Sequence, residues 1–286
     1  MNNILEVNNL RKEYNDFTLR NISFSLERGY IMGFIGPNGA GKSTTIKLIM
    51  NLIKKNTGEI KIFGLDNIAH EKDIKQKIGF VYDENYYYEE LTINEMKKII
   101  SPFYINWDEK SFQNYIKQFD LNPKKKIKEL SKGMKIKFSL AVAISHGAEL
   151  IIMDEPTSGL DPVFRREILD ILYSLIQDEN KGIFFSTHIT TDLEKVADYI
   201  TFINKGEIVF SMPKDNILDK YAIVKGSKEL LDLDTKKEFL NISENSFGFE
   251  ALTDNIAKIR SLFKNNVIIE RPSLEDIMVH TVKKVI

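Results

Sequence analysis

The chain has 286 residues, of which 43% are hydrophobic and 28% are charged, a composition typical of globular proteins and not of disordered ones. Lys and Arg total 40 while Asp and Glu total 41, so the net charge of -1 argues against a dedicated nucleic-acid-binding protein. The absence of cysteine excludes disulfides, thiolate metal sites and cysteine nucleophiles.

No stretch of the sequence approaches the ~20 consecutive apolar residues that a membrane-spanning helix requires. Residues 1–14 carry charged side chains where a signal peptide would have an apolar core. We therefore expect an intracellular protein that is made without a membrane segment of its own.

Strand patterns recur along the first part of the chain, at residues 4–7, 22–26, 30–35, 58–63 and 78–81. A glycine-rich turn at residues 36–41 follows the third of these strands and leads into an amphipathic helical pattern over residues 46–53. From about residue 85 to 147 the pattern is mainly helical, which predicts a helical subdomain.

Strands and helices alternate again after residue 147. The expected strands lie at residues 150–153, 183–186, 199–203 and 207–210, and the expected helices begin after Pro162 and at residue 192. This alternation indicates an α/β fold with a mostly parallel sheet covered by helices. An antiparallel β subdomain and the helical subdomain would complete a main domain of residues 1–212.

The pattern changes near residues 212–220, and the tail mixes strand and helix signals. Strand-like runs lie at residues 222–224, 238–242 and 267–269, with a helix around residues 254–263 and a last helix from Pro272 or Ser273. We interpret residues 213–286 as a small accessory α+β domain.

Gly36, Gly41, Lys42 and Ser43 fit the phosphate-loop pattern of two glycines separated by four residues and followed by Lys and Ser. Glycines let the backbone turn its N–H groups inward around phosphate oxygens, and the helix that follows adds its positive dipole end. We expect Lys42 to reach the β- and γ-phosphates and Ser43 to offer its hydroxyl to Mg²⁺. A chance glycine turn is the alternative, but the motif lies between a buried strand and an amphipathic helix, as it must.

The apolar strand at residues 150–153 ends in two carboxylates, Asp154 and Glu155. Parallel sheets present their chemistry at such strand ends. We expect Asp154 to support Mg²⁺ and Glu155 to polarise an attacking water molecule. The alternative is an ordinary strand followed by an acidic turn.

Two further polar residues are uninformative in isolation. Ser131 precedes a helical run, where a serine is typically a helix cap. His188 follows the strand at residues 183–186, and a lone histidine there is more often a satisfied polar residue than a catalytic one.

Taken together, the order and spacing of these segments resemble the ATP-binding-cassette ATPases over residues 4 to about 210. The matching elements are Tyr14, the phosphate loop, Leu130-Ser131-Lys132-Gly133-Met134, Ile152-Met153-Asp154-Glu155, Ser158-Gly159-Leu160-Asp161 and Ser186-Thr187-His188. The segment around Ser131 looks like the signature loop that separates this family from other phosphate-loop proteins.

The resemblance implies that two nucleotide-binding subunits pair head to tail around two ATP molecules. It implies that Tyr14 stacks on adenine, that Glu155 is the general base or orients water, and that His188 contacts the γ-phosphate. The residues that would line the triphosphate are Gly36, Asn38, Gly39, Gly41, Lys42, Ser43 and Thr44.

The same resemblance implies contacts with the partner subunit. Ser131 and Gly133 would reach the partner's γ-phosphate through a hydroxyl and a backbone N–H. Asp161 would lie in the loop that crosses the dimer interface.

The chain departs from the usual family pattern at two sites. Asp83 stands where glutamine is usual, and we predict that it contacts the metal, because a carboxylate can bind Mg²⁺. Lys132 stands where glycine is usual, and Met134 replaces a polar residue. These departures resemble a divergent branch of exporter ATPases for antibiotics or peptides in Gram-positive bacteria. Residues 271–276 also resemble the closing motif of such exporter subunits.

The leading hypothesis is an ATP-hydrolysing subunit of an export transporter, bound peripherally to the cytoplasmic face of the membrane. Its partners would be a separate polytopic permease and a second nucleotide-binding subunit, with ATP and Mg²⁺ as cofactors. One alternative is a regulatory ATPase of the same family that needs no membrane partner, and another is a catalytically weak nucleotide-binding module in a heterodimer.

Three other features have competing interpretations. Residues 86–88 are three tyrosines that could form an adhesive docking surface or fold onto their own helices. The lysine-rich run at residues 124–128 is interpreted as a solvated face and not a nucleic-acid patch. Residues 204–207 are interpreted as a hairpin turn between two strands.

Overall fold

The computed structural model describes residues 2–82 and 86–282. The chain divides into two compact units, one of Met1–Asp192 with Val196–Ser211 and one of Leu193–Lys195 with Met212–Ile286. The sequence-based division into domains 1–212 and 213–286 stays a prediction.

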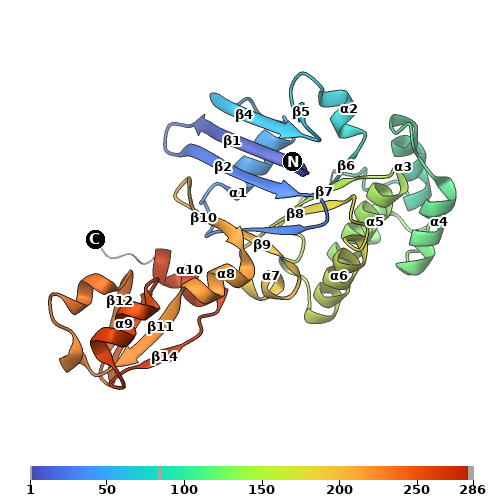
Figure 1. Ribbon diagram of the computed structural model, residues 1–286. Helices are drawn as coiled ribbons and strands as arrows, with labels where there is room; N and C mark the ends of the chain where they lie inside the picture. Colours follow the sequence, from blue (N-terminus) through green and yellow to red (C-terminus); the bar gives the residue numbers. More distant parts are fainter. Residues whose placement is uncertain (1, 83–85, 283–286) are drawn as a thin grey trace. The chain divides into compact units, whose positions relative to one another are not determined.

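The first unit contains a four-stranded antiparallel sheet (Figure 1). Its strands, in the order β2-β1-β4-β5, are β2 (Thr18–Glu27), β1 (Asn3–Glu13), β4 (Thr57–Ile62) and β5 (Leu65–Asp66). Ile22, Phe24 and Leu26 on β2 are buried and alternate with exposed residues, which is the period-2 pattern of a strand with one face in the core.

A six-stranded sheet carries the centre of the first unit. Its strands, in the order β10-β9-β3-β8-β7-β6, are β10 (Glu207–Pro213), β9 (Tyr199–Asn204), β3 (Ile31–Ile35), β8 (Gly182–Thr187), β7 (Leu150–Asp154) and β6 (Ile78–Val81). The neighbours from β9 to β6 pair in parallel. All residues of β3, β7 and β8 are buried, as expected for parallel strands covered on both faces.

An aromatic cluster packs the two sheets together. The Phe24 ring lies 5.5 Å from the Phe34 ring and 5.5 Å from the Phe184 ring, measured between centroids. These side chains come from the antiparallel sheet and from the adjacent strands β3 and β8. The core therefore spans both sheets.

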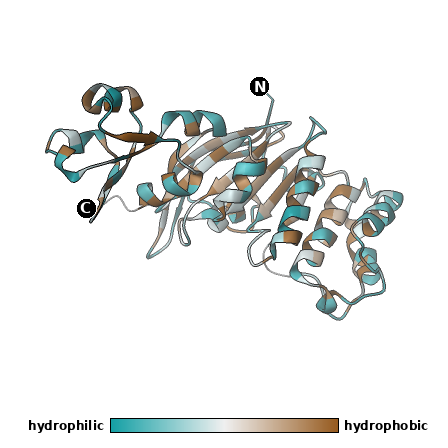
Figure 2. Cartoon of the chain, turned by 90° about the horizontal axis from the view of Figure 1, so that it is seen from below, coloured by the Kyte–Doolittle hydropathy of each residue, from teal (hydrophilic) through white to brown (hydrophobic). Residues whose placement is uncertain are grey.

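Helices cover the six-stranded sheet and extend from its β6 side. They are α1 (Lys42–Ile49), α2 (Glu71–Lys75), α3 (Ile93–Ile100), α4 (Glu109–Gln118), α5 (Lys132–Ser145), α6 (Pro162–Leu175) and α7 (Thr190–Val196). The group α3 to α5 matches the mainly helical pattern of the sequence. Figure 2 shows hydrophobic and hydrophilic bands alternating along these helices, as amphipathic packing requires.

The three tyrosines at residues 86–88 do not share one exposed surface. Tyr86 and Tyr88 are exposed, at 62% and 66%, whereas Tyr87 turns inward and its hydroxyl donates to Ser139 Oγ at 2.9 Å. Burial raises the pKa of Tyr87 to about 12. The interpretation of three exposed rings is therefore wrong for Tyr87, because its ring packs against Phe138.

The second unit is built on a four-stranded antiparallel sheet in the order β12-β13-β11-β14. Its elements are α8 (Lys214–Lys220), β11 (Ala222–Gly226), β12 (Asn241–Asn245), β13 (Gly248–Thr253), α9 (Ile256–Phe263), β14 (Ile268–Glu270) and α10 (Leu274–Val282). The strand order is that of the β-α-β-β-α-β motif, with two 3-10 turns, Lys228–Leu230 and Thr235–Glu238, where the first helix would lie.

The strand predicted at residues 238–242 is wrong in its first half. A 3-10 turn ends at Glu238 and β12 begins only at Asn241. Phe239 between them is buried against the rings of Phe249 and Phe263, so its apolar character reflects the core and not a strand. The predicted fold class is otherwise confirmed, with a mostly parallel sheet, an antiparallel sheet, a helical group and an α+β appendage.

Candidate functional site

The turn between β3 and α1 adopts a backbone that requires glycine at two positions. A Cβ on Gly36 would lie 2.3 Å from the Ile203 carbonyl oxygen. Gly41 has a φ of +111° and its Cβ would lie 2.5 Å from Leu19 Cδ2, so a side chain there would be both strained and blocked. No side chain caps the N-terminus of α1, which leaves its first N–H groups available to an anion.

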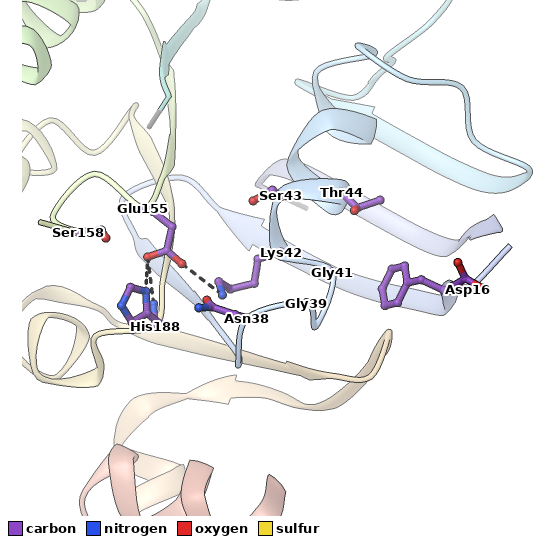
Figure 3. A pocket seen from close by; sticks show the side chains of 11 residues that line it. Asp16, Asn38, Gly39, Gly41, Lys42, Ser43, Thr44, Glu155, Ser158 and His188 are labelled. Atoms are coloured by element: carbon purple, nitrogen blue, oxygen red, sulfur yellow. Dashed lines mark hydrogen bonds and ion pairs between the residues drawn. The ribbon is translucent and has the colours of Figure 1, made fainter. Parts of the chain in front are cut away.

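This turn forms one wall of a cavity of about 700 Å³. The cavity is lined by Asp16, Phe17, Asn38, Gly39, Gly41, Lys42, Ser43, Thr44, Glu155, Ser158 and His188. Its volume is within the range of about 300–1,000 Å³ that small-molecule sites occupy. Figure 3 shows these side chains gathered from the turn, from the end of β7 and from the segment after β8.

Lys42 is the cation of the cavity wall, and only 6% of its side chain is exposed. Its Nζ donates to the Gly36 carbonyl oxygen at 2.8 Å and lies 3.2 Å from Glu155 Oε1. A buried ammonium group is tolerated when such partners are present. The lysine is therefore held at the mouth of the glycine turn, where phosphate oxygens would bind.

Glu155 connects Lys42 to His188. Its second carboxylate oxygen, Oε2, lies 2.7 Å from His188 Nδ1 (dashed in Figure 3). Glu155 has a φ of 49°, a left-handed conformation that is uncommon for residues other than glycine. Its backbone N–H donates to the Ser186 carbonyl oxygen at 3.0 Å, and this bond to the neighbouring strand holds the strained turn.

Asp154 lies beneath the cavity and not on its wall, because it is the last residue of β7 and only 2% exposed. Burial raises the pKa of its carboxyl group, and hydrogen bonds from the Ser186 and Ser43 side chains oppose that rise. The Ser186 Oγ donates to Asp154 Oδ1 at 2.5 Å. Asp154 thus connects the cavity residue Ser43 to the centre of the sheet.

Eight of the predicted site residues line the cavity: Asn38, Gly39, Gly41, Lys42, Ser43, Thr44, Glu155 and His188. The predicted residue Gly36 instead shapes the turn from behind. Tyr14 is 47% exposed and lies beside Lys12, whose Nζ is 5.1 Å from the centre of its ring. Its predicted stacking on adenine stays a prediction.

Phe17, Asp16 and Ser158 line the cavity although the sequence did not identify them as site residues. A Cβ on Gly41 would lie 3.0 Å from Phe17 Cζ, so this ring packs directly on the glycine turn. The available signal was the position of Phe17 in the same tight turn as Tyr14, whose N–H donates to the Phe17 carbonyl oxygen at 2.8 Å.

A second turn supports the glycine-rich one. Lys205 and Gly206 both have positive φ, at 47° and 79°, as the two central residues of a type I′ hairpin do. The Gly206 N–H donates to the Ala40 carbonyl oxygen at 3.0 Å, and its own carbonyl oxygen accepts from Arg20 N–H at 2.7 Å. The hairpin predicted at residues 204–207 is therefore a support for the phosphate-loop turn.

The predicted partner-facing residues lie at two helix N-termini. Ser131 caps α5, with its Oγ accepting from Met134 N–H at 3.3 Å. Asp161 caps α6 and accepts from Val163 N–H at 2.9 Å. A Cβ on Gly133 would lie 2.7 Å from the Phe164 ring, so this glycine is also a close contact between α5 and α6. None of these three lines the cavity among the described residues.

The predicted metal contact Asp83 lies outside the described residues. Among residues 2–82 and 86–282, no group of three or more His, Asp or Glu side chains is arranged to hold a metal ion. Mg²⁺ in nucleotide sites uses one or two protein oxygens plus phosphate oxygens and water. The Ser43 hydroxyl and Asp154 carboxylate, which are hydrogen-bonded, are a donor set of that kind.

The chain is similar to known ATP-binding proteins of transporters. A family model described as "ABC transporter" matches residues 19–158. The bacitracin transport ATP-binding protein of Bacillus licheniformis is 33% identical over 221 residues, which cover 76% of this chain and 72% of that protein. The lantibiotic transport ATP-binding protein of Streptococcus pyogenes is 32% identical over 215 residues, covering 74% of this chain and 92% of that protein.

A solved structure has the same core fold. The structure of an ATP-binding subunit of an ABC transporter superposes with a TM-score of 0.69 at 29% identity, and the match covers 76% of this chain and 92% of that one. The matched segments contain the glycine turn, whose geometry is given above.

Proposed function

Because the chain belongs to the ABC transporter family, as an ATP-binding subunit with ATPase activity, we propose that it powers export by a separate transmembrane permease. The observation that carries the proposal is the convergence of Lys42, Glu155 and His188 on one cavity beside the N-terminus of α1. That arrangement pairs a phosphate-binding wall with a carboxylate able to act on water.

ATP binding would use the charges already in position. The free N–H groups at the start of α1 and the Lys42 ammonium group would take the β- and γ-phosphates. Binding must exchange the contact between Lys42 and Glu155, at 3.2 Å, for one between Lys42 and phosphate. The Glu155 carboxylate would thereby become available to water.

Ser43 and Asp154 would hold Mg²⁺, with Asp83 as a further proposed contact. Bound Mg²⁺ would offset the negative charge of the phosphates. The raised pKa of Asp154 reflects its burial, and a cation nearby would favour the ionised carboxylate.

Hydrolysis would use Glu155 and His188 together. Glu155 would accept a proton from, or orient, the water that attacks the γ-phosphorus. His188 Nδ1 lies 2.7 Å from Glu155 Oε2, so the histidine can keep the carboxylate aimed while contacting the γ-phosphate. Tyr14 would stack on adenine, and Gly36 would preserve the shape of the loop.

A second nucleotide-binding subunit would complete each site. Ser131, Gly133 and Asp161 lie at the start of α5 and α6 and do not line the cavity of their own chain, considered over the described residues. Head-to-tail pairing would bring Ser131 and Gly133 to the γ-phosphate in the partner, and Asp161 to the interface.

The permease would be the membrane component. No helix within the described residues is long and apolar enough to cross a bilayer. Tyr86 and Tyr88 expose aromatic surface beside the helical group, and we propose that they contact the permease at the cytoplasmic face of the membrane. The two named relatives are transport proteins for bacitracin and a lantibiotic, which favours export of an antibiotic or peptide.

The test of the hydrolytic mechanism is Glu155→Gln. The amide keeps the size of the side chain but cannot accept a proton, so ATP turnover should fall by about 10²-fold or more. ATP binding should persist, and light scattering should detect an ATP-dependent dimer. The matched control Glu207→Gln changes an exposed residue of β10 that does not line the cavity. Unchanged turnover in Glu155→Gln would contradict the mechanism.

The test of the transport role is purification from native membranes. A polytopic protein that co-purifies with the chain and stimulates its ATPase activity would support the permease proposal. Replacing Tyr86 and Tyr88 by Ala should weaken that association. A fully active ATPase that co-purifies with no membrane protein would favour the regulatory alternative, and a chain that binds ATP without hydrolysing it would favour the weak-partner alternative.

A further inference from the structure

Helix α7 joins the segment after His188 to the second unit. The helix begins at Thr190 and ends at Val196, and its residues Leu193–Lys195 belong to the second unit. A short helix is a stiff connection, because its backbone hydrogen bonds fix the residues along it. The position of His188 is therefore linked through the chain itself to whatever holds Glu194.

Glu194 is held by two bonds within the second unit. Its Oε1 accepts from the Leu274 N–H at 2.8 Å, and its backbone carbonyl oxygen accepts from Lys214 Nζ at 2.8 Å. Leu274 is the first residue of α10. A carboxylate at a helix N-terminus gains from the helix dipole as well as from the charge-assisted hydrogen bond, so this contact is stronger than an ordinary surface bond.

Residues 271–276, the closing motif, shape the helix end that receives Glu194. Ser273 N–H donates to Asp276 Oδ2 at 2.9 Å, and Asp276 N–H donates to Ser273 Oγ at 3.1 Å. This reciprocal pair is a capping box. The Leu274 side chain is fully buried. The motif therefore fixes the first turn of α10 and leaves the Leu274 N–H for Glu194.

The other end of α7 is also anchored. Asp192 is 2% exposed, and both of its carboxylate oxygens lie 3.2 Å from Arg165 Nε on α6. Ile189 N–H donates to Thr187 Oγ1 at 3.0 Å. With both ends fixed, a change at Glu194 is transmitted along α7 and is not absorbed by a flexible loop.

We propose that Glu194 and the closing motif position His188 for its contact with the γ-phosphate, so that the second unit tunes ATP hydrolysis. This rests on the proposed role of His188. Glu194 is a positioning residue, because it acts through α7 and touches neither nucleotide nor water. Hydrolysis is sensitive to such positioning, since a displacement of about 1 Å can cost about 10²-fold in rate.

The experiment compares Glu194→Ala with Glu194→Gln in the full chain. Removing the acceptor should lower kcat for ATP by about tenfold while the affinity for ADP, which has no γ-phosphate, stays unchanged. Glu194→Gln keeps an oxygen that can accept from Leu274 N–H, and it should restore most of the rate. The matched control is Glu275→Ala, which removes an exposed carboxylate from α10 itself.

A double-mutant cycle with His188→Ala separates positioning from general damage to the fold. If Glu194 acts through His188, then Glu194→Ala should cause no further loss of kcat when His188 is already Ala. The proposal is overturned if Glu194→Ala stays within twofold of the unmodified chain, or if it lowers kcat equally in both backgrounds. Glu155→Gln measured alongside distinguishes the two levels, because only its retained turnover contradicts the proposed function itself.

Discussion

At the scale of single residues, Phe17 offers a direct test of base recognition. Its ring lines the cavity and packs on Gly41. Stacking of a base on an aromatic ring is worth about 1–3 kcal/mol, so Phe17→Ala should raise the Kd for ATP by about tenfold. Binding can be followed by isothermal titration calorimetry.

Tripolyphosphate, which has no base, is the control for this variant. Its affinity should be the same in Phe17→Ala and in the unmodified chain. A parallel loss of tripolyphosphate binding would mean that Phe17 supports the glycine turn and not the base. Tyr14→Ala in the same assay measures the share of its more exposed ring.

Residues in short local patterns were predictable, and residues brought in by the fold were not. Lys42 and Ser43 are fixed by the glycine turn and helix that adjoin them in sequence, and the strand of Asp154 and Glu155 ends at the same sheet edge. Phe17 and Ser158 join the cavity from other segments, so their roles depend on packing that no local pattern encodes. The capping role of Asp161 was likewise visible only as a helix start.

At the scale of elements, Gly133 sets how closely α5 approaches α6. A Cβ there would lie 2.7 Å from the Phe164 ring, and overpacking of this kind costs about 1–3 kcal/mol. Gly133→Ala should therefore lower the free energy of unfolding of the chain alone, measured by urea denaturation without ATP. The smaller side chain in a Gly133→Ala, Phe164→Leu double variant should recover part of the loss.

This expectation bears on how the proposed partner contact is examined. If Gly133→Ala leaves the stability unchanged but abolishes the ATP-dependent dimer, the glycine acts only at the interface. If both fall and both recover in the double variant, the packing of α5 on α6 is the cause.

His146 at the end of α5 makes the helical group sensitive to acid. Its ring stacks on Tyr104 at 3.8 Å and its Nδ1 lies 3.2 Å from the Gln76 carbonyl oxygen. Burial lowers the pKa of His146 to about 4. The unfolded chain therefore binds a proton at a higher pH than the folded chain does. Stability is complete above pH ~6.5 and falls by about 3 kcal/mol as the pH drops toward 4.

His146→Phe keeps a ring beside Tyr104 but removes the titrating group. It should lower stability at pH 7 by about 1 kcal/mol through the lost hydrogen bond, yet flatten the decline between pH 6.5 and 4. Urea denaturation across that range measures both effects. His70→Phe, at a half-exposed position, should leave the decline as it is, and an unchanged slope in His146→Phe would contradict the assignment.

Element type followed the sequence where burial followed a regular period. β2 and the buried strands of the parallel sheet had such patterns. In the second unit, β13 (Gly248–Thr253) was not predicted, because its apolar residues are divided between two covered faces and its hairpin has no strong turn dipeptide. Tyr87 was misread for a similar reason, since only the neighbouring helix α5 turns it inward.

At the scale of the whole molecule, nucleotide should stabilise the unit that contains the cavity. A ligand at 100 times its Kd adds about 2.7 kcal/mol to the folded state. In Glu155→Gln, which should bind without turnover, Mg²⁺ and ATP should slow hydrogen exchange over residues 36–44 and raise the melting temperature. Removing Mg²⁺ with EDTA should reverse part of this gain, and Lys42→Ala should abolish it. An equal gain in Lys42→Ala would place the ATP elsewhere.

The support of the glycine turn by Gly206 has a consequence for mutational tolerance. A Cβ at this position would lie 2.0 Å from the Thr18 carbonyl oxygen, so every substitution must displace β2 or the hairpin, and with them Ala40. Random mutagenesis under selection for transport should leave position 206 nearly as invariant as Gly41. The neighbouring Lys205, whose side chain has no such constraint from packing, should accept many residues, most readily asparagine and aspartate.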